Sequence, residues 1–313
     1  CRFLACFVGW VSWIYHIIPD DLGMAAVESD GPSRRMFRFF QGDHALPSLT
    51  TLLSADKVGT KAATLSQLYA WGYPVAPGYV LPAGDDPTAL LNTVFPHASL
   101  RPTAHEPPPD TSTLNRKGSY KRKRDRKRTG ITVVARSSAV GEDTLTASAA
   151  GQYVSVTEIT SAEALDQAIT VCLNAYNAPS AVRYRQDRDI PEGKMNVLVQ
   201  PHIFGAFSGV AFSRDPVTHV GDTVVVEALP GDASQVVSGQ ITPERYQVNV
   251  SELPENGDWK MPAETTLPLR GMGSAPKELI QQVAYLTRHI ENSFHGIPRS
   301  EERRVGKECR SRW

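Results

Sequence analysis

The stretch at residues 131–156 reads ITVVARSSAVGEDTLTASAAGQYVSV and determines how the rest of the chain is interpreted. It opens with a β-branched run, residues 131–134, which predicts a buried strand. Small and polar residues follow, so we expect the strand to deliver Arg136 into a loop of serine, alanine and glycine. Small side chains leave backbone N–H groups uncovered, and the arginine fork matches phosphate oxygens. The pattern indicates a phosphate-binding loop, while an ordinary Ser/Gly-rich surface loop fits the same residue types.

Two acidic residues in the same loop, Glu142 and Asp143, admit two interpretations. Their carboxylates could hold a metal ion, because hard divalent cations prefer oxygen ligands. They could also orient the arginine by pairing with its guanidinium. The residue types leave both roles open.

The chain has the composition of a globular protein. It contains 313 residues, 41% of them hydrophobic, and its formal net charge is zero. This length allows one large or two ordinary domains with a substantial core, and the charge predicts no partner. Cys172 lies inside the body of the chain, and the other cysteines lie near its ends without paired spacing. Neither a disulfide framework nor a zinc site is indicated, so a reducing, cytoplasmic location is expected.

Both ends of the chain depart from this composition. Residues 1–18 are nearly all apolar but fall short of the roughly 20 residues that a membrane-spanning helix needs. We interpret residues 1–48 as an N-terminal extension, in which Met24 is the true start and residues 1–23 are translated non-coding sequence. A membrane anchor or an organelle transit peptide are the alternatives. Residues 299–313 resemble the translation of a sequencing adapter, with a genuine basic tail as the alternative.

Organised sequence begins at Leu49. Apolar spacing predicts a helix that starts at about Lys61 and stops at Gly72, followed by a short strand at residues 79–81. A lysine at a helix N-terminus opposes the helix dipole and has no structural benefit there. Because an ammonium and a helix N-terminus together suit an anion, Lys61 is a candidate phosphate ligand. A solvated surface lysine is the alternative.

Between residues 82 and 130 the sequence predicts little order apart from a helical patch at residues 88–95. Residues 100–130 are rich in proline and charge, which predicts a disordered basic insertion. Its segment 116–128 holds nine Lys or Arg against the single Asp125. A nuclear-localisation or nucleic-acid-binding patch would fit such a run. A solvated linker is the preferred interpretation, because aromatic residues for base stacking are lacking apart from Tyr120.

Periodicity predicts further elements in the second half of the chain. Helices are expected at residues 161–176 with Ser161 as N-cap, at residues 180–188 and at residues 276–294. Strands are expected at residues 196–200, 209–213 and 223–228. Their β-branched runs fit one shared sheet that is partly buried under helices.

Several motifs resemble those of the phosphoenolpyruvate synthase and pyruvate, phosphate dikinase family. The stretch from Arg136 to Gln152 is similar, in register, to the family's ATP-site signature VRSSATAEDxxxxSFAGQxxTxLNV. Residues 58–81 resemble the family's VGGKAANLGEL and GxPVPPGFVL motifs, and residues 195–228 resemble its VxVQxMVxAxxSGVxFTxDPxTG and VVIEA block. The sequence departs from the family pattern at four places. Thr60 replaces a second glycine, Ala149 replaces phenylalanine, Ser155 stands where threonine is commoner, and residues 231–234 replace a GLGE turn.

The resemblance implies an α+β fold in the form of an ATP-grasp-like, two-lobed nucleotide-binding module over residues 49–298, truncated at its C-terminal end. ATP and Mg²⁺ would bind between the lobes. The ATP-binding residues that the resemblance implies are Lys61, Arg136, Gly151, Ser155 and Gln200. Gln200 falls near the adenine end, where its amide offers both a donor and an acceptor. The candidates for binding the metal, or for surrounding its ligands, are Glu142, Asp143, Asp215 and Glu227. Asp215 could instead cap the turn at Pro216.

The family is one of ATP-dependent phosphotransferases. Phosphoenolpyruvate synthases convert ATP, pyruvate and water to phosphoenolpyruvate, AMP and phosphate through a phosphohistidine. Neither the carrier histidine nor the pyruvate-binding barrel has a counterpart in this sequence, so no catalytic residue is assigned and this chain alone is expected to be inactive. A related dikinase, an antibiotic phosphotransferase and a non-catalytic nucleotide-binding or interaction fragment stay open as alternatives. No membrane or nucleic-acid partner is expected.

Overall fold

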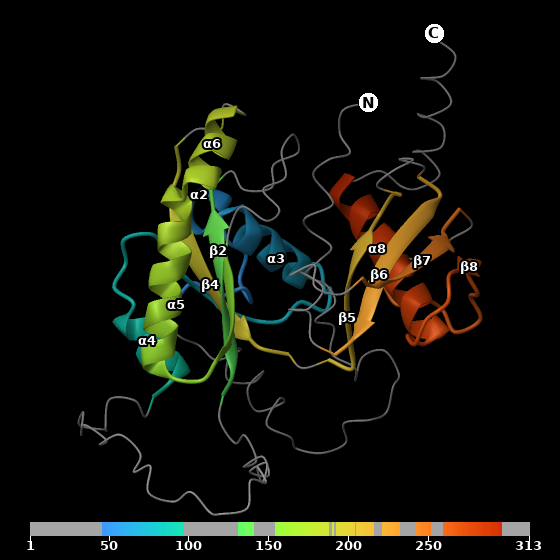
Figure 1. The fold of residues 1–313 in the computed structure, drawn as a ribbon, viewed down its shortest axis with the longest axis horizontal. Helices are drawn as coiled ribbons and strands as arrows, with labels where there is room; N and C mark the ends of the chain where they lie inside the picture. Colours follow the sequence, from blue (N-terminus) through green and yellow to red (C-terminus); the bar gives the residue numbers. More distant parts are fainter. Residues whose placement is uncertain are drawn as a thin grey trace, which may run out of the picture.

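The computed structural model describes residues 46–96, 131–140, 154–187, 190, 192–203, 205–215, 221–231, 242–251 and 259–295. The expected α+β class is confirmed, because these residues form two four-stranded antiparallel sheets with helices packed on them. In Figure 1 the two sheets lie side by side, each with its own helices. Among the residues described, no helix has the length and apolar character needed to span a membrane.

The first sheet has the strand order β1-β4-β2-β3. Its strands are β1 (Tyr79–Leu81), β2 (Val133–Ala139), β3 (Ser155–Ile159) and β4 (Met195–Pro201). Every residue of β2 and of β4 is buried. Helices cover both faces of these two central strands.

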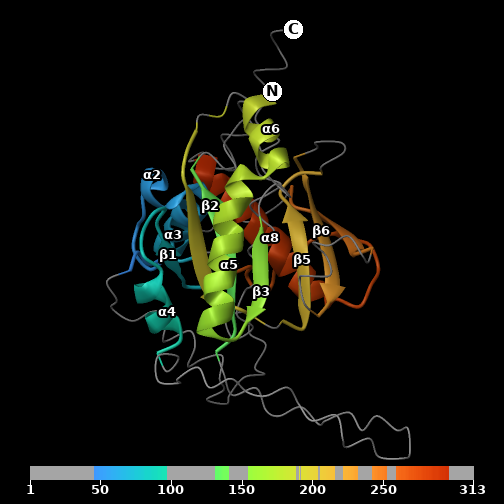
Figure 2. The ribbon, with the colours of Figure 1, turned by 60° about the vertical axis from the view of Figure 1, so that its left-hand side comes forward.

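Helices cover the two faces of the first sheet. One face packs against α4 (Thr88–Val94) and α5 (Ala162–Asn174), through residues such as Leu90 and Leu165. Figure 2 shows α5 lying along this sheet. The other face packs against α2 (Ala55–Val58) and α3 (Thr60–Ala70), where Val58 and Leu65 contact Leu198 of β4.

The helices begin where the sequence predicts. The Ser161 Oγ accepts a hydrogen bond from the backbone N–H of Ala164 at 3.1 Å, which caps α5 as expected. The helix predicted from about Lys61 is α3, and Gly72 follows its end with a φ of 82°. A short 3₁₀ turn, η4 (Ala175–Asn177), leads from α5 into α6 (Pro179–Asp187), the helix expected at residues 180–188.

The second sheet has the order β5-β6-β7-β8. Its strands are β5 (Phe207–Phe212), β6 (Thr223–Pro230), β7 (Glu244–Asn249) and β8 (Leu269–Arg270). One face of it packs against α8 (Lys277–His295), where Val226 and Tyr246 meet Ile280 and Val283. Leu68 and Tyr73, from the end of α3 and the turn after it, join the same apolar cluster. The helix α8 therefore contacts both halves of the structure.

Two expectations about the strands are wrong. The three strand runs predicted to share one sheet are divided, because β4 belongs to the first sheet and β5 and β6 to the second. Arg136 does not follow the strand in a loop, because β2 continues through Ala139. Small polar residues can occupy a central strand when both neighbouring strands satisfy its backbone, and β3 and β4 do so here.

The helical patch predicted at residues 88–95 is confirmed. It is α4, and its Leu90 and Val94 are completely buried in the core of the first sheet. The predicted insertion at residues 100–130 and the two chain ends, residues 1–45 and 296–313, lie outside the described residues.

Candidate functional site

The N-terminal end of α3 is fixed to strand β2. Gly59 has a φ of +83°, and a Cβ atom there would lie only 2.2 Å from the carbonyl oxygen of Ser138. The Ser138 hydroxyl donates to the carbonyl of Val58 at 2.9 Å and accepts from the backbone N–H of Ala62 at 3.1 Å. The turn between α2 and α3 therefore needs glycine at position 59, both for its conformation and for this close approach.

This arrangement brings Lys61 to the strand. The Lys61 Nζ donates to the carbonyl oxygen of Ser137 at 3.1 Å, although the two residues are 76 positions apart in the sequence. Thr60, which replaces a glycine of the resembling motif, is the first residue of α3. A helical residue does not need the conformational freedom of glycine, so Thr60 is compatible with the observed turn.

Three other expected ATP-binding residues lie on one face of the first sheet. Arg136 of β2 pairs with Ser155 of β3 and with Leu198 of β4, and directly opposite residues in a sheet point to the same face. Gln200 follows Leu198 by two positions and therefore shares that face. Since Leu198 packs against α2 and α3, this is the face on the side of Lys61.

Lys61, Arg136, Ser155 and Gln200 are thus gathered on one side of the first sheet, as the sequence predicts for an ATP site. Gly151, Glu142 and Asp143 lie outside the described residues.

Arg136 carries its charge in a buried position. The residue is only 6% exposed, and this burial lowers the pKa of its guanidinium to about 9. The group therefore stays protonated at neutral pH. A guanidinium presents a fork of N–H donors that matches phosphate oxygens, which makes Arg136 suited to a polyphosphate ligand.

Gln200 has a fixed orientation. Its Nε2 donates to the carbonyl oxygen of Ala76 at 2.8 Å, and the residue is buried. Gly78 lies so close that a Cβ atom there would be 2.7 Å from the Gln200 Cγ. This bond uses one of the two amide N–H groups, and the Oε1 atom can accept a hydrogen bond from a ligand.

The two remaining acidic candidates lie on the second sheet. Glu227 of β6 pairs across the strands with Arg245 of β7, whose Nη1 is 3.8 Å from the Glu227 Oε1. The Nη2 of Arg245 is 3.7 Å from the Asp215 Oδ2, and Gln247 donates to the same oxygen at 3.3 Å. The Asp215 carboxylate is therefore directed to β7, whereas the sequence also allowed it to cap the turn at Pro216, a residue outside the described ones.

Carboxylates such as these fit Mg²⁺, which commonly takes one or two from the protein and completes its shell with phosphates and water. Within the described part of the chain, no three His, Cys, Asp or Glu side chains form a cluster of metal-binding type. Asp215 and Glu227 have Arg245 as their common cationic neighbour.

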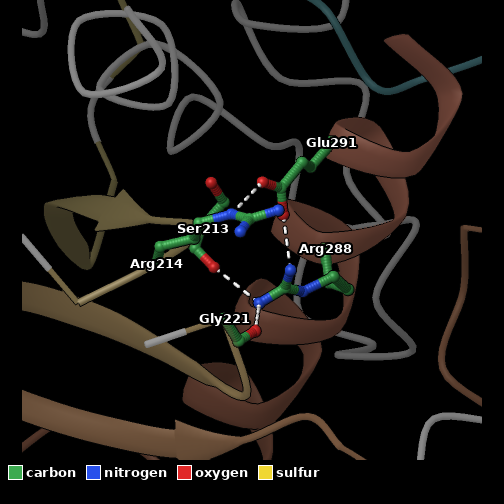
Figure 3. A network of polar contacts seen from close by, with 5 residues as sticks. All are labelled: Ser213, Arg214, Gly221, Arg288 and Glu291. Atoms are coloured by element: carbon green, nitrogen blue, oxygen red, sulfur yellow. Dashed lines mark hydrogen bonds and ion pairs between the residues drawn. The ribbon is translucent and has the colours of Figure 1, made fainter. Parts of the chain in front are cut away.

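A buried ionic network near Asp215 was not anticipated from the sequence. Arg288 and Glu291 of α8 form an ion pair of 2.6 Å, and Glu291 also accepts from the Arg214 Nε at 2.8 Å (Figure 3). The Nη2 of Arg288 donates to the carbonyl oxygens of Ser213, at 2.7 Å, and of Gly221. The helix α8 therefore binds residues at both ends of the connection between β5 and β6, with Ser213 and Arg214 at its start and Gly221 near its end. An arginine and a glutamate three positions apart in a helix were a usable signal.

Comparison with known proteins gives a family for this chain. Residues 111–267 match the family model described as the AMP/ATP-binding domain of pyruvate phosphate dikinase. The uncharacterized phosphotransferase YvkC of Bacillus subtilis is 36% identical over 121 residues, which are 38% of this chain and 15% of that protein. A probable phosphoenolpyruvate synthase of Methanocaldococcus jannaschii is 34% identical over 125 residues, 39% of this chain and 10% of that protein.

A longer match of lower identity is found with the prodigiosin synthesizing transferase PigC of Serratia marcescens. The two proteins are 28% identical over 214 residues, which are 64% of this chain and 24% of PigC. The chain thus spans between a tenth and a quarter of the length of these relatives. Because the family model covers half of the chain, including β2 with Arg136, this protein belongs to the pyruvate phosphate dikinase AMP/ATP-binding domain family.

Proposed function

We propose that this chain is the ATP-binding part of a phosphoenolpyruvate synthase-type phosphotransferase, with an ATP-grasp-like, two-lobed site that takes ATP and Mg²⁺. The observation that carries the proposal is the hydrogen bond from the Lys61 Nζ to the carbonyl of Ser137, at 3.1 Å. It brings the lysine of one motif next to Arg136 of another, so that two cations lie at one end of α3. A helix N-terminus with two cations beside it suits a polyphosphate.

In this proposal each residue has a distinct role. Lys61 and Arg136 neutralise the phosphate oxygens, an effect that is strong because Arg136 is buried where the effective dielectric constant is low. The Gln200 Oε1 accepts from the exocyclic amino group of adenine, and the hydrogen bond from the amide nitrogen to Ala76 fixes the side chain for this role. Ser155, directly opposite Arg136, offers a hydroxyl on the same face.

When bound, Mg²⁺ would supply positive charge that stabilises the phosphates. Asp215 and Glu227 are the described residues that we propose to hold it, directly or through water, and Gly151, Glu142 and Asp143 complete the proposed site from the sequence. The side chains of this chain do the binding and orienting, and no residue described here is assigned to proton transfer.

The relatives, one of which is named as a probable phosphoenolpyruvate synthase, support a proposal for the reaction of the whole protein. We propose that ATP, pyruvate and water give phosphoenolpyruvate, AMP and phosphate, and that a phosphohistidine on a domain outside this sequence carries the phosphoryl group. The chain alone would then bind ATP without completing the reaction.

Titration calorimetry of the 313-residue chain with ATP and Mg²⁺ tests the proposal. We expect Lys61→Ala and Arg136→Ala each to weaken ATP binding roughly 10- to 100-fold, because each removes a charge-assisted hydrogen bond to phosphate. Lys57→Ala is the matched control, since Lys57 lies one helix earlier and is exposed.

The control variant should bind ATP like the wild type. Equal affinity of all four proteins would refute the assignment of Lys61 and Arg136, and no detectable binding by a folded wild-type chain would refute the ATP site itself. Thermal unfolding of each variant separates loss of binding from loss of fold.

A further inference from the structure

We infer that Tyr176, held by Arg185, is a positioning residue for the nucleotide site, because it fixes the end of the strand that carries Arg136. The inference rests on the proposed function. Tyr176 lies in η4, the 3₁₀ turn between α5 and α6, and belongs to none of the motifs that predict the ATP site.

Arg185 holds Tyr176 in two ways. Its Nη1 donates to the carbonyl oxygen of Tyr176 at 2.7 Å, and its guanidinium carbon lies 3.8 Å from the centroid of the tyrosine ring. The first contact fixes the backbone of the turn, and the second is a cation–π contact that fixes the ring. A planar guanidinium can make both contacts at once.

The tyrosine in turn holds the start of β4. Its Oη accepts a hydrogen bond from the backbone N–H of Gly193 at 2.6 Å. Its ring packs with Ala139 at the end of β2 and with Met195 at the start of β4, and the residue is only 8% exposed. The buried hydroxyl therefore has a defined partner, and removing it would leave the Gly193 N–H without this acceptor.

Gly193 closes the connection to β2. A Cβ atom at position 193 would lie 3.2 Å from both the Cβ and the carbonyl oxygen of Val140. The backbone N–H of Val140 donates to the carbonyl of Lys194 at 3.2 Å, which extends the pairing of β2 and β4 beyond Ala139 and Met195. In Figure 1 the arrowhead of β2 points toward α6. Contacts thus run without a break from Arg185 on α6 to the end of β2.

This end of β2 matters for the site because it lies next to the cationic residues. Arg136 and Ser137 precede Ala139 in the same strand, and the Ser137 carbonyl is the acceptor for Lys61. A shift at the end of the strand would displace the guanidinium and the ammonium together. Misplacement by about 1 Å is enough to lower the activity of a positioned group considerably.

The test uses the full chain with Tyr176→Phe, Arg185→Gln and Arg185→Lys. Two quantities are measured: amide hydrogen exchange at Val140 and Gly193 without nucleotide, and the Kd for ATP with Mg²⁺. We expect faster exchange at both amides and about 3- to 10-fold weaker ATP binding for Tyr176→Phe and Arg185→Gln. Arg185→Lys should recover part of the affinity, because it keeps a cation over the ring and a donor for the carbonyl.

Two control variants make the same kinds of change at positions away from Tyr176 and Arg185. Tyr246→Phe also removes a tyrosine hydroxyl that accepts from a backbone N–H, that of Ala275, but it does so in the second sheet. Arg183→Gln removes the same charge from an exposed position on the same helix as Arg185. Both should bind ATP like the wild type, even where Tyr246→Phe lowers the unfolding temperature.

The outcomes separate the inference from the function on which it rests. Unchanged exchange at Val140 in Tyr176→Phe, or faster exchange with an unchanged Kd, would overturn the positioning role while leaving the ATP site in place. A wild-type chain that does not bind ATP would overturn the proposed function, and the inference would fall with it. If Arg183→Gln also weakened ATP binding, the loss of affinity in Arg185→Gln would be assigned to the general charge of α6.

Discussion

Gly59 is the residue whose replacement the structure tolerates least at the proposed ATP site. Its φ is +83°, and a Cβ atom added to it would lie 2.2 Å from the carbonyl oxygen of Ser138. Because the obstacle is backbone rather than a flexible side chain, Gly59→Ala must move α3 away from β2. We expect a loss of about 2–4 kcal/mol in the free energy of unfolding, from conformational strain and overpacking together. Denaturant unfolding measures it.

Gly84 provides the matched control for this prediction. Its φ of +90° is similarly left-handed, but nothing lies within 4 Å of a Cβ built on it. Gly84→Ala should therefore cost only the conformational part, about 1 kcal/mol. In addition, Gly59→Ala should weaken ATP binding, since Lys61 moves with α3, and Gly84→Ala should not. Equal costs for the two substitutions would contradict the contact between Gly59 and Ser138 as the cause.

At the scale of elements, α8 depends on the charge of Glu291. The Glu291 carboxylate is the shared partner of Arg288 and Arg214, and its side chain is only 3% exposed. Glu291→Gln removes the negative charge that pairs with both arginines and places a neutral amide beside the buried Arg288 guanidinium. We expect a loss of about 3–5 kcal/mol in the free energy of unfolding, measured by denaturant titration.

Glu278→Gln on the same helix is the control, because Glu278 is exposed in the first turn of α8. It should change stability by less than about 0.5 kcal/mol. A double-mutant cycle between Glu291→Gln and Arg214→Gln then isolates one of the two pairs. A cost for Glu291→Gln as small as that of Glu278→Gln would show that water replaces the ion pairs.

The helices were predictable from the sequence, while the pairing of the strands was not. Apolar residues at helical spacing located α3, α5 and α8, since that period is a local property. The partner of a strand is a long-range property: runs at residues 196–200 and 209–213 look alike, yet they enter different sheets. The strand β7 was missed for another reason, because its arginine, glutamine and asparagine side chains interrupt the apolar run.

The candidate site was predictable in residues but not in geometry. The motifs named Lys61, Arg136, Ser155 and Gln200, which the structure brings to one side of the first sheet. They placed Arg136 in a loop, because small polar residues are typical of loops when neighbouring strands are unknown. The roles of Arg245, Arg288 and Tyr176 depend on contacts across strands and helices, which a linear pattern does not contain.

At the scale of the molecule, Tyr73 joins the two halves. Its Oη lies 2.6 Å from the His289 Nδ1 and 2.6 Å from the Ser293 Oγ, both on α8. Trp71 and Phe294 meet edge to face next to it, with ring centroids 5.0 Å apart. Tyr73→Ala removes the ring and the hydroxyl, which we expect to cost about 3–5 kcal/mol and to divide thermal unfolding into two transitions.

Differential scanning calorimetry of the wild type and of two variants checks this prediction. Leu90→Ala is the comparison, because Leu90 is equally buried but packs only within the first sheet and its helices. It should lower the unfolding temperature without dividing the transition. One two-state transition in Tyr73→Ala, with equal calorimetric and van't Hoff enthalpies, would contradict the view that this contact couples the halves.

The strand order of the first sheet also has a consequence for how the protein is made. A chain emerges from the ribosome in sequence order, and β1 must wait for its ladder partner β4, which ends at Pro201. The strand β2, which Lys61 contacts, is likewise missing until its residues have been synthesised, more than 70 positions later. The cationic residues of the site therefore cannot assemble in part while the chain is being synthesised. They take their final positions only after residue 201 has been synthesised, when β4 inserts between β1 and β2.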